Sequence, residues 1–202
     1  MSEPRIETWF PKSIYIREDF SLDLLADIET TIKERKIETI RDQELFVDST
    51  HRTDRELHKE LDCFKTLSNR IEDEIRQFMY SLGYAPNVAD LAFIAGMWYN
   101  TSNKGDFVFP HNHAGSVISG AFYVKAAEEN KIIFYDNLND LQQPVDYPNE
   151  LSFATVNYQC VPGRLLLWRS NLVHGTPVQL QPGEKIVISF NALIRTSPET
   201  LR

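Results

Sequence analysis

The sequence predicts a mainly β protein with N-terminal helices, an α+β arrangement in which two or more helices buttress a β-sandwich, a β-barrel or a jelly roll. Three observations support this prediction. Before Pro86, apolar residues recur at helical spacing in two stretches, and after it come six short β-rich runs separated by turn signals. No linker composition marks the change. We therefore expect residues 1–202 to form one domain, with a helical buttress over residues 1–90 and the β-core over residues 91–195.

The first ninety residues predict one strand and two helices. TWFPKSIYIRED, residues 8–19, has strand character, and Pro11 restricts it to a sheet edge or a bulge. Residues 21–36 predict a helix because leucines and isoleucines recur three and four residues apart. A longer amphipathic helix is predicted over residues 64–82, where Gly83 is a plausible stop.

The β-rich runs are, in order, LAFIAGMWYN, DFVFPHNH, SGAFYVKA, KIIFYDN, GRLLLWRS and EKIVISFNALI. Short turn-like segments such as NKG, AAEEN and QPGE separate them. One connection is longer, at residues 137–149, and is rich in Asn, Asp and Pro. It is long enough to cover a pocket as a lid, and a solvated loop is the alternative interpretation.

Composition and charge exclude several classes of protein. The chain is 42% hydrophobic and 25% charged, which is typical of a soluble globular protein. A formal net charge of -8 argues against nucleic-acid binding by bulk electrostatics. The first ten residues contain no apolar signal core and no apolar run is long enough to span a membrane, so we expect a cytoplasmic protein without a membrane partner. The oligomeric state stays open, a homodimer included. Cys63 and Cys160 lie far apart, which predicts two reduced thiols.

Two histidines, His111 and His113, stand one residue apart in the strand-like stretch GDFVFPHNHAGSVISGAFYV. Residues i and i+2 of a strand point to the same side, so both imidazoles face one side of a sheet. Two neutral imidazoles are a good pair of ligands for a divalent metal ion. A third ligand has to come from elsewhere in the chain. The candidates are His174, where the GRLLLWRS run passes into a loop, and Asp136, at the end of KIIFYD.

A wider pattern strengthens the metal hypothesis, because an HxH pair alone could also be a surface pair. Gly105 lies six residues before the first histidine of the pair, and Tyr123 lies twelve residues after it. Lys185 follows the distal histidine by eleven residues and opens the strand-like run KIVISFN. The two remaining histidines, His51 and His58, lie in a charged stretch that we interpret as helical, and we expect them to be structural or exposed.

In this order and at this spacing, GDFVFPHNH, SGAFYV, IIFYD, PGRLLLWRSNLVH and GEKIVISFN resemble the Fe(II)- and 2-oxoglutarate-dependent oxygenases. The resemblance is strongest to their prolyl-hydroxylase-like branch and to a group of small bacterial and phage members. It covers residues 98–191. It implies a double-stranded β-helix, which is a jelly roll with the metal in its mouth. It also implies Fe(II) as the metal, 2-oxoglutarate as the co-substrate and O2.

The resemblance assigns the metal ligands by position. The family holds iron with two histidines and one carboxylate in the pattern HxD…H. His111 matches the first histidine and His174 the distal one, whereas His113 falls where the carboxylate usually stands. We favour a site of these three histidines, with Asp136 as the alternative third ligand. HxH at this place is usual among the small members. A neutral ligand in place of an anionic one raises the charge of the site by one unit.

The resemblance also implies residues that bind the co-substrate. Lys185 matches the basic residue that holds the far carboxylate of 2-oxoglutarate, although Arg is frequent there in relatives. Tyr123 matches a tyrosine that hydrogen-bonds the same carboxylate. Asn191 lies six residues after Lys185 on the same strand face, and we expect it to touch the metal-proximal end of the ligand. No catalytic residue is expected beyond the metal ligands.

The implied activity is that of a 2-oxoglutarate-dependent dioxygenase, a hydroxylase that converts 2-oxoglutarate to succinate and CO2 as it hydroxylates a C–H bond. The substrate would be a peptide or protein side chain or a small molecule. Two alternatives stay open. One is a cupin-like metal-dependent isomerase or dioxygenase without 2-oxoglutarate, because GDFVFPHNH also fits G-x5-H-x-H, although the later cupin motif is missing. The other is a non-catalytic jelly-roll binding protein.

Overall fold

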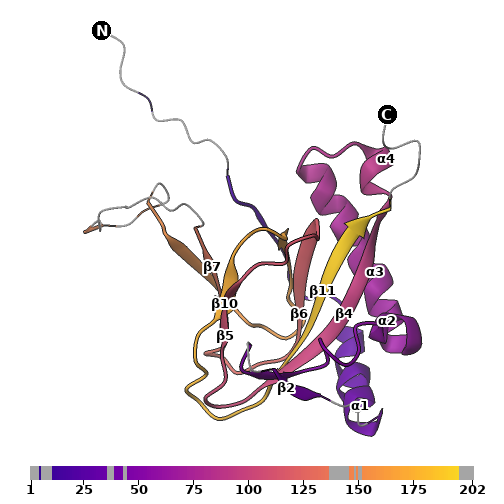
Figure 1. The fold of residues 1–202 in the computed structure, drawn as a ribbon, viewed down its shortest axis with the longest axis vertical. Coiled ribbons are helices and arrows are strands. Elements are labelled where there is room, and N and C mark those ends of the chain that lie inside the picture. The colour runs from indigo at the N-terminus through magenta and orange to yellow at the C-terminus, as the bar shows by residue number, and fades with distance from the viewer. Residues whose placement is uncertain are drawn as a thin grey trace.

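The computed structural model describes residue 5 and residues 11–35, 39–42, 45–136, 146–147, 149 and 152–195. The connection considered as a lid, residues 137–149, lies almost wholly outside these residues. In the described part, two β-sheets face each other and the helices stand on the outer side of the larger sheet (Figure 1).

The helices are η1, a short 3-10 helix (Leu22–Leu24), α1 (Leu25–Arg35), α2 (Leu57–Glu60), α3 (Asp62–Ser81) and α4 (Pro86–Ala89). The strands are β1 (Ile14–Arg17), β2 (Ile40–Asp42), β3 (Val47–Ser49), β4 (Ala92–Ser102), β5 (Val108–His111), β6 (Ile118–Lys125), β7 (Lys131–Tyr135), β8 (Thr155–Gln159), β9 (Leu165–Arg169), β10 (His174–Thr176) and β11 (Lys185–Ile194).

The strand order identifies the fold as a jelly roll, as predicted. The larger sheet has seven strands in the order β1-β9-β6-β11-β4-β3-β2, and the smaller has four in the order β5-β10-β7-β8. Neighbouring strands are antiparallel throughout. From β4 to β11 the chain passes repeatedly between the two sheets, which is the connectivity of a double-stranded β-helix.

The N-terminal elements confirm the predicted helices and add two strands. The predicted helix over residues 21–36 is η1 followed by α1, and the second is α3, after which Gly83 adopts a left-handed φ of 87°. Strand β1 lies at an edge of the larger sheet, as Pro11 predicted. Strands β2 and β3 were not predicted, because three-residue strands are too short to show a period in the sequence.

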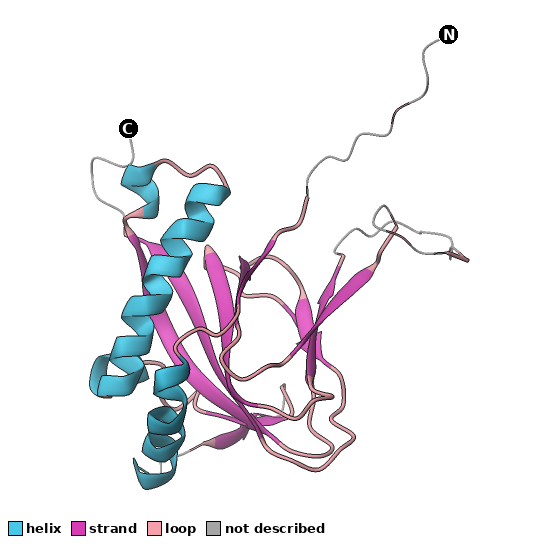
Figure 2. Ribbon diagram, turned by 180° about the vertical axis from the view of Figure 1, so that it is seen from behind, coloured by secondary structure: helices cyan, strands magenta, loops and turns pink. Residues whose placement is uncertain are grey.

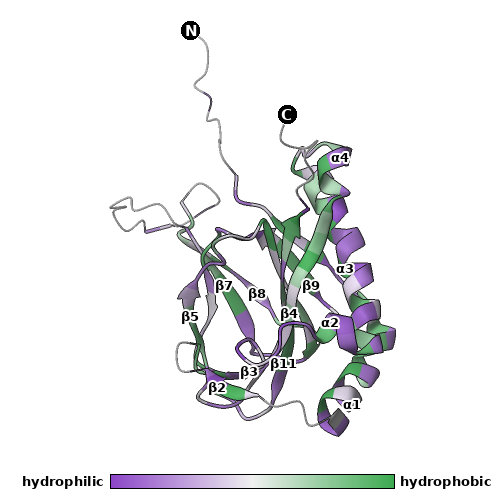
Figure 3. Ribbon diagram, turned by 45° about the vertical axis from the view of Figure 1, so that its right-hand side comes forward, coloured by the Kyte–Doolittle hydropathy of each residue, from purple (hydrophilic) through white to green (hydrophobic). Residues whose placement is uncertain are grey.

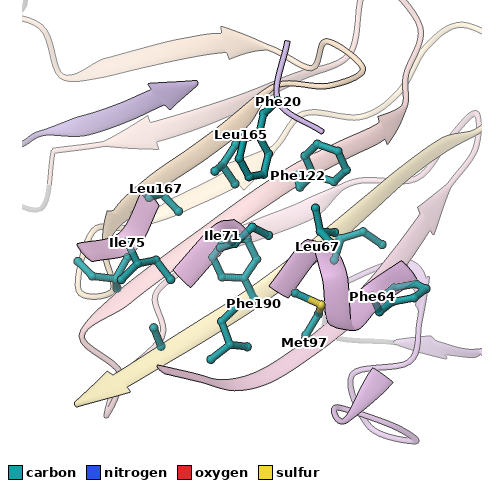
Figure 4. Packing of buried hydrophobic residues seen from close by; sticks show 14 of the residues in the cluster. Phe20, Phe64, Leu67, Ile71, Ile75, Met97, Phe122, Leu165, Leu167 and Phe190 are labelled. Carbon is teal, nitrogen blue, oxygen red and sulfur yellow. The ribbon is translucent and has the colours of Figure 1, made fainter. Parts of the chain in front are cut away.

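Helix α3 buries its apolar stripe against the outer face of the larger sheet (Figure 2). Its hydrophilic side faces away from the strands (Figure 3). The helix contributes Phe64, Leu67, Ile71 and Ile75, and the sheet contributes Phe122, Leu165, Leu167 and Phe190 (Figure 4). Burial of one such side chain stabilises the fold by about 1.5–3 kcal/mol, so this layer contributes substantially to stability.

Strand β11 has two different faces because it lies between β6 and β4 in the middle of the larger sheet. Ile186, Ile188 and Phe190 are buried in the core beneath the helices. The alternate residues Lys185 and Val187 line a cavity between the two sheets. One strand therefore supplies both the core and the cavity.

Two predictions about the chain as a whole can be compared with the structure. Cys63 and Cys160 are free thiols, and Cys160 is buried. None of the described helices is long and apolar enough to cross a membrane.

Candidate active site

Three histidines meet at the junction of β5 and β10. His111 ends β5, His174 begins β10, and the two residues are direct partners across the antiparallel pair. His113 follows β5, and its backbone N–H donates to the carbonyl of Ser170 at 2.9 Å. One ring nitrogen from each histidine lies within 4.8 Å of the others. The structure therefore brings together the three histidines that the sequence grouped.

The hydrogen bonds of two histidines orient their rings. His111 Nδ1 lies 2.8 Å from the carbonyl oxygen of Phe109, and His174 Nδ1 lies 3.0 Å from that of Leu172. A carbonyl oxygen only accepts, so both Nδ1 atoms carry the proton and both Nε2 atoms keep a lone pair. His113 Nε2 lies 3.3 Å from His174 Nε2. Such carbonyl partners are the usual outer supports of metal-binding histidines.

Burial keeps two of the imidazoles neutral at pH 7. Burial, and secondly the nearby His111, lower the pKa of His174 to about 3. The same two causes lower the pKa of His113 to about 4. Neutral imidazole is the form that binds a metal ion. The chemistry and spacing of the three rings therefore fit a divalent cation.

Asp136, the alternative third ligand, is not brought into this cluster. Its carboxylate accepts a hydrogen bond from Lys12, in the segment before β1. It neither belongs to the group of candidate ligands nor lines the cavity beside them. The position usually held by a carboxylate is occupied by His113.

The cavity extends from the histidines between the two sheets and has a volume of ≈370 Å³. Lys185 and Tyr123, which the sequence assigned to the co-substrate, both line it. Both are buried, and burial lowers the pKa of Lys185 and raises that of Tyr123 well above its usual value. Lys185 forms no ion pair with a carboxylate of the described residues. A buried cation that forms no ion pair within the described residues favours an anionic ligand.

Three further polar atoms on the cavity wall support this interpretation. Ser102 Oγ, Trp168 Nε1 and Thr176 Oγ1 are buried and find no hydrogen-bond partner in the described part of the chain. Ser102 is also the direct cross-strand neighbour of Lys185. Leaving such a group unpaired costs about 1–3 kcal/mol. Donors of this kind suit a carboxylate, so the chemistry of the cavity wall fits 2-oxoglutarate.

Asn191 has a different position from the one expected. Its amide nitrogen lies 3.3 Å from His113 Nδ1, and its amide oxygen accepts a hydrogen bond from Ser119 Oγ at 2.7 Å. It is absent from the residues that line the cavity. Asn191 therefore lies behind His113, on the side away from the space available to a ligand.

His51 is a cavity residue that the sequence interpretation missed. It lies in a turn after β3, not in a helix, and its ring centroid is 4.6 Å from that of Trp98. The Trp98 ring is in turn 6.0 Å from that of His113. Burial, and secondly Arg55, lower the pKa of His51 to about 4. His51 lies beside the cavity because the short strand β3 precedes it. No local pattern in the sequence predicts that strand.

Comparison with known families supports the same chemistry. Residues 96–191 match the family described as "Putative 2OG-Fe(II) oxygenase". This range includes the three clustered histidines, the two cavity residues assigned to the co-substrate and Asn191. No curated protein matches the chain.

Several solved structures share the fold at low sequence identity. The non-heme alpha ketoglutarate dependent epimerase SnoN from nogalamycin biosynthesis is 12% identical, with a TM-score of 0.67 over 92% of this chain and 80% of that one. HygX from Streptomyces hygroscopicus, with nickel and 2-oxoglutarate bound, is 11% identical, with a TM-score of 0.62 over 91% and 83%. A Pseudomonas putida prolyl-4-hydroxylase is 11% identical, with a TM-score of 0.61 over 92% and 94%.

Proposed function

We propose that this chain, whose residues 96–191 match the family described as "Putative 2OG-Fe(II) oxygenase", is an Fe(II)- and 2-oxoglutarate-dependent oxygenase that hydroxylates its substrate at an iron held by His111, His113 and His174. The observation that carries the proposal is the position of the three rings at one end of a cavity that the buried Lys185 also lines, a lysine that forms no ion pair within the described residues. Iron, 2-oxoglutarate and O2 together supply an oxidative decarboxylation coupled to hydroxylation of a C–H bond. The protein residues supply binding, orientation and exclusion of water.

The three imidazoles would hold the metal, and the co-substrate and O2 would bind beside them. The backbone carbonyls behind His111 and His174 keep those rings in the tautomer that binds a metal. Three neutral ligands leave the full charge of Fe(II) uncompensated by protein. This charge favours 2-oxoglutarate, whose keto acid end is anionic, as a ligand.

The far carboxylate of 2-oxoglutarate would lie against Lys185, with Tyr123, Ser102 and Thr176 as further hydrogen-bond donors. What supports this is that all four residues line the same buried cavity. Charge-assisted hydrogen bonds in such a site are stronger than neutral ones. The lysine therefore contributes most of the affinity, and the hydroxyl groups contribute orientation.

The substrate is proposed to be a peptide or protein side chain or a small molecule with an apolar part. The similar folds include a viral collagen prolyl hydroxylase and an epimerase crystallised with nogalamycin RO, which supports a substrate of either size. Phe46, Phe107 and Phe109 form a contiguous aromatic cluster, with centroid separations of 4.7–5.5 Å. Phe109 is 50% exposed and also lines the cavity, which provides an apolar contact at its mouth.

The test is the weak visible charge-transfer band of Fe(II) chelated by 2-oxoglutarate, measured without O2. We expect the band in the wild-type protein and its loss in His174→Ala and His113→Ala. Asp136→Asn is the matched control, because that carboxylate lies outside the cluster, and it should keep the band. A folded, iron-loaded protein without the band would contradict the use of 2-oxoglutarate. A His113→Ala protein with full iron affinity would contradict the third ligand.

A further inference from the structure

Behind His113 lies a closed chain of hydrogen bonds. Asn191 Nδ2 is 3.3 Å from His113 Nδ1, and Asn191 Oδ1 accepts from Ser119 Oγ at 2.7 Å. Ser119 Oγ is in turn 2.8 Å from Ser170 Oγ. Both serines are fully buried, and the carbonyl of Ser170 accepts from the backbone N–H of His113. The chain therefore holds His113 at its ring and at its backbone.

In this arrangement the proton of His113 lies on the nitrogen that should bind the metal. An amide nitrogen only donates, so His113 Nδ1 accepts and the neutral ring carries its proton on Nε2. His174 Nε2 has a lone pair, because its Nδ1 donates to the carbonyl of Leu172. The 3.3 Å contact between the two Nε2 atoms is then a hydrogen bond from His113 to His174. The two nitrogens that face the metal position therefore bind each other.

A metal ion needs the lone pair of His113 Nε2, so the proton must be on Nδ1 and needs an acceptor there. Turning the Asn191 amide by 180° places Oδ1 against Nδ1–H and Nδ2 against Ser119 Oγ. Ser119 then donates to Ser170, so every hydrogen bond of the chain is kept. The ring stays neutral, because one proton leaves Nε2 and one is taken up at Nδ1.

We propose that Asn191 is the positioning residue that sets the tautomer of His113, and that its amide reverses when a metal ion binds. His111 and His174 rest on carbonyl oxygens, which can only accept and so keep one tautomer. His113 rests instead on a group that both donates and accepts. His113, which stands in the carboxylate position, can therefore be hydrogen-bonded by Asn191 in either tautomer. The inference relies on the proposed metal site.

The direct test is the ¹⁵N NMR spectrum of the histidine rings, with Zn(II) as a diamagnetic probe. Signals of His113 are assigned by their loss in His113→Gln. In the metal-free protein we expect the proton on Nε2, and in the Zn(II)-loaded protein on Nδ1. A metal-free protein that already carries the proton on Nδ1 would overturn the proposal.

Two substitutions of Asn191 give the complementary test. Asn191→Leu removes the acceptor and should weaken Zn(II) binding by about 10–100-fold, as loss of an outer support does elsewhere. Asn191→Asp replaces the amide with a carboxylate, which can accept a hydrogen bond from His113 Nδ1. This variant should therefore bind Zn(II) as tightly as the wild type. Its His113 ring should carry the proton on Nδ1 even in the metal-free protein. Asn157→Leu, at an exposed asparagine of β8, is the control and should bind Zn(II) as the wild type does.

The outcomes separate this inference from the proposed function. Wild-type protein that binds no Zn(II) would contradict the metal site itself. Tight binding by the wild type and equally tight binding by Asn191→Leu would refute only the role of Asn191. If Asn191→Leu does not fold, the spectrum of metal-free Asn191→Asp decides, and a proton that remains on Nε2 refutes the proposal.

Discussion

The two faces of the seven-stranded sheet differ in the kind of side chain that they bury. On the helix side, Ile188 and Phe190 of β11 are buried among apolar side chains from α3. On the cavity side, the same strand presents Lys185 to a space whose walls include the hydroxyl groups of Ser102 and Thr176, which have no hydrogen-bond partner in the described part of the chain. The first face contains contacts that stabilise the fold. The second contains polar groups that a bound ligand would satisfy.

This contrast indicates that stability and chemistry are separated within single strands. Alternate residues of a strand point to opposite sides, so β11 contributes to both without a conflict between them. Substitutions on the helix side should therefore change the free energy of unfolding and leave ligand affinity unchanged. Substitutions on the cavity side should change ligand affinity and leave the free energy of unfolding unchanged. Four predictions test this separation, beginning with the largest effect.

Phe190→Ala should have the largest effect on stability. Its ring is 1% exposed and lies against Gly120, where any Cβ would collide with it. Deletion of a buried phenylalanine ring lowers the free energy of unfolding by about 3–5 kcal/mol, which urea denaturation would measure. The folded fraction should bind Zn(II) with wild-type affinity. A Phe190→Ala variant with unchanged stability and lost Zn(II) binding would contradict the separation between the helix side and the cavity side of the sheet.

Lys185→Met should affect the ligand most. Loss of a hydrogen-bonded charge removes about 1.5–3 kcal/mol, or roughly 10–100-fold in the affinity for 2-oxoglutarate. Because the charge is buried without a described partner, the ligand-free variant should be at least as stable as the wild type. Titration with 2-oxoglutarate and thermal unfolding provide the two measurements, and Lys104→Met at an exposed position is the control. A large fall in ligand-free stability would show that the lysine is structural.

Thr176→Val should produce a smaller effect of the same kind. The hydroxyl has no partner among the described residues, so its removal should not weaken the ligand-free fold. If it donates to the bound carboxylate, affinity should fall by about 0.5–1.5 kcal/mol, measurable by the same titration. An unchanged affinity would exclude Thr176 from the co-substrate site.

Asp23→Asn should produce the smallest effect, although Arg70 binds this carboxylate with two hydrogen bonds of 2.7 and 2.9 Å. The pair lies on the solvent side of the helical layer, where water screens it. Arg70 holds the pKa of Asp23 below its usual value. Its small stabilisation is therefore present at neutral pH and disappears as the pH falls through that lowered pKa. Urea unfolding should show a slight difference from the wild type at pH 7 that becomes smaller as the pH is lowered, and a large difference would mean that ion pairs, not packing, hold this layer.

Much of the architecture and the centre of the site could be predicted from the sequence. The long amphipathic stripe of α3 and the alternating β-rich runs are local periodic signals, which survive in any fold that buries them. The pair His111 and His113 was recognisable for the same reason, because its spacing of two determines a shared face. Lys185 was recognised from its distance along the chain to His174.

Other features were decided only by the tertiary structure, because they depend on contacts between residues far apart in the sequence. Strand pairing places His111 opposite His174. The carboxylate of Asp136 accepts a hydrogen bond from Lys12 and is not part of the histidine cluster. The position of Asn191 was expected from alternation alone. Whether such a side chain reaches the ligand or the back of His113 depends on how the sheets close, which no local pattern records.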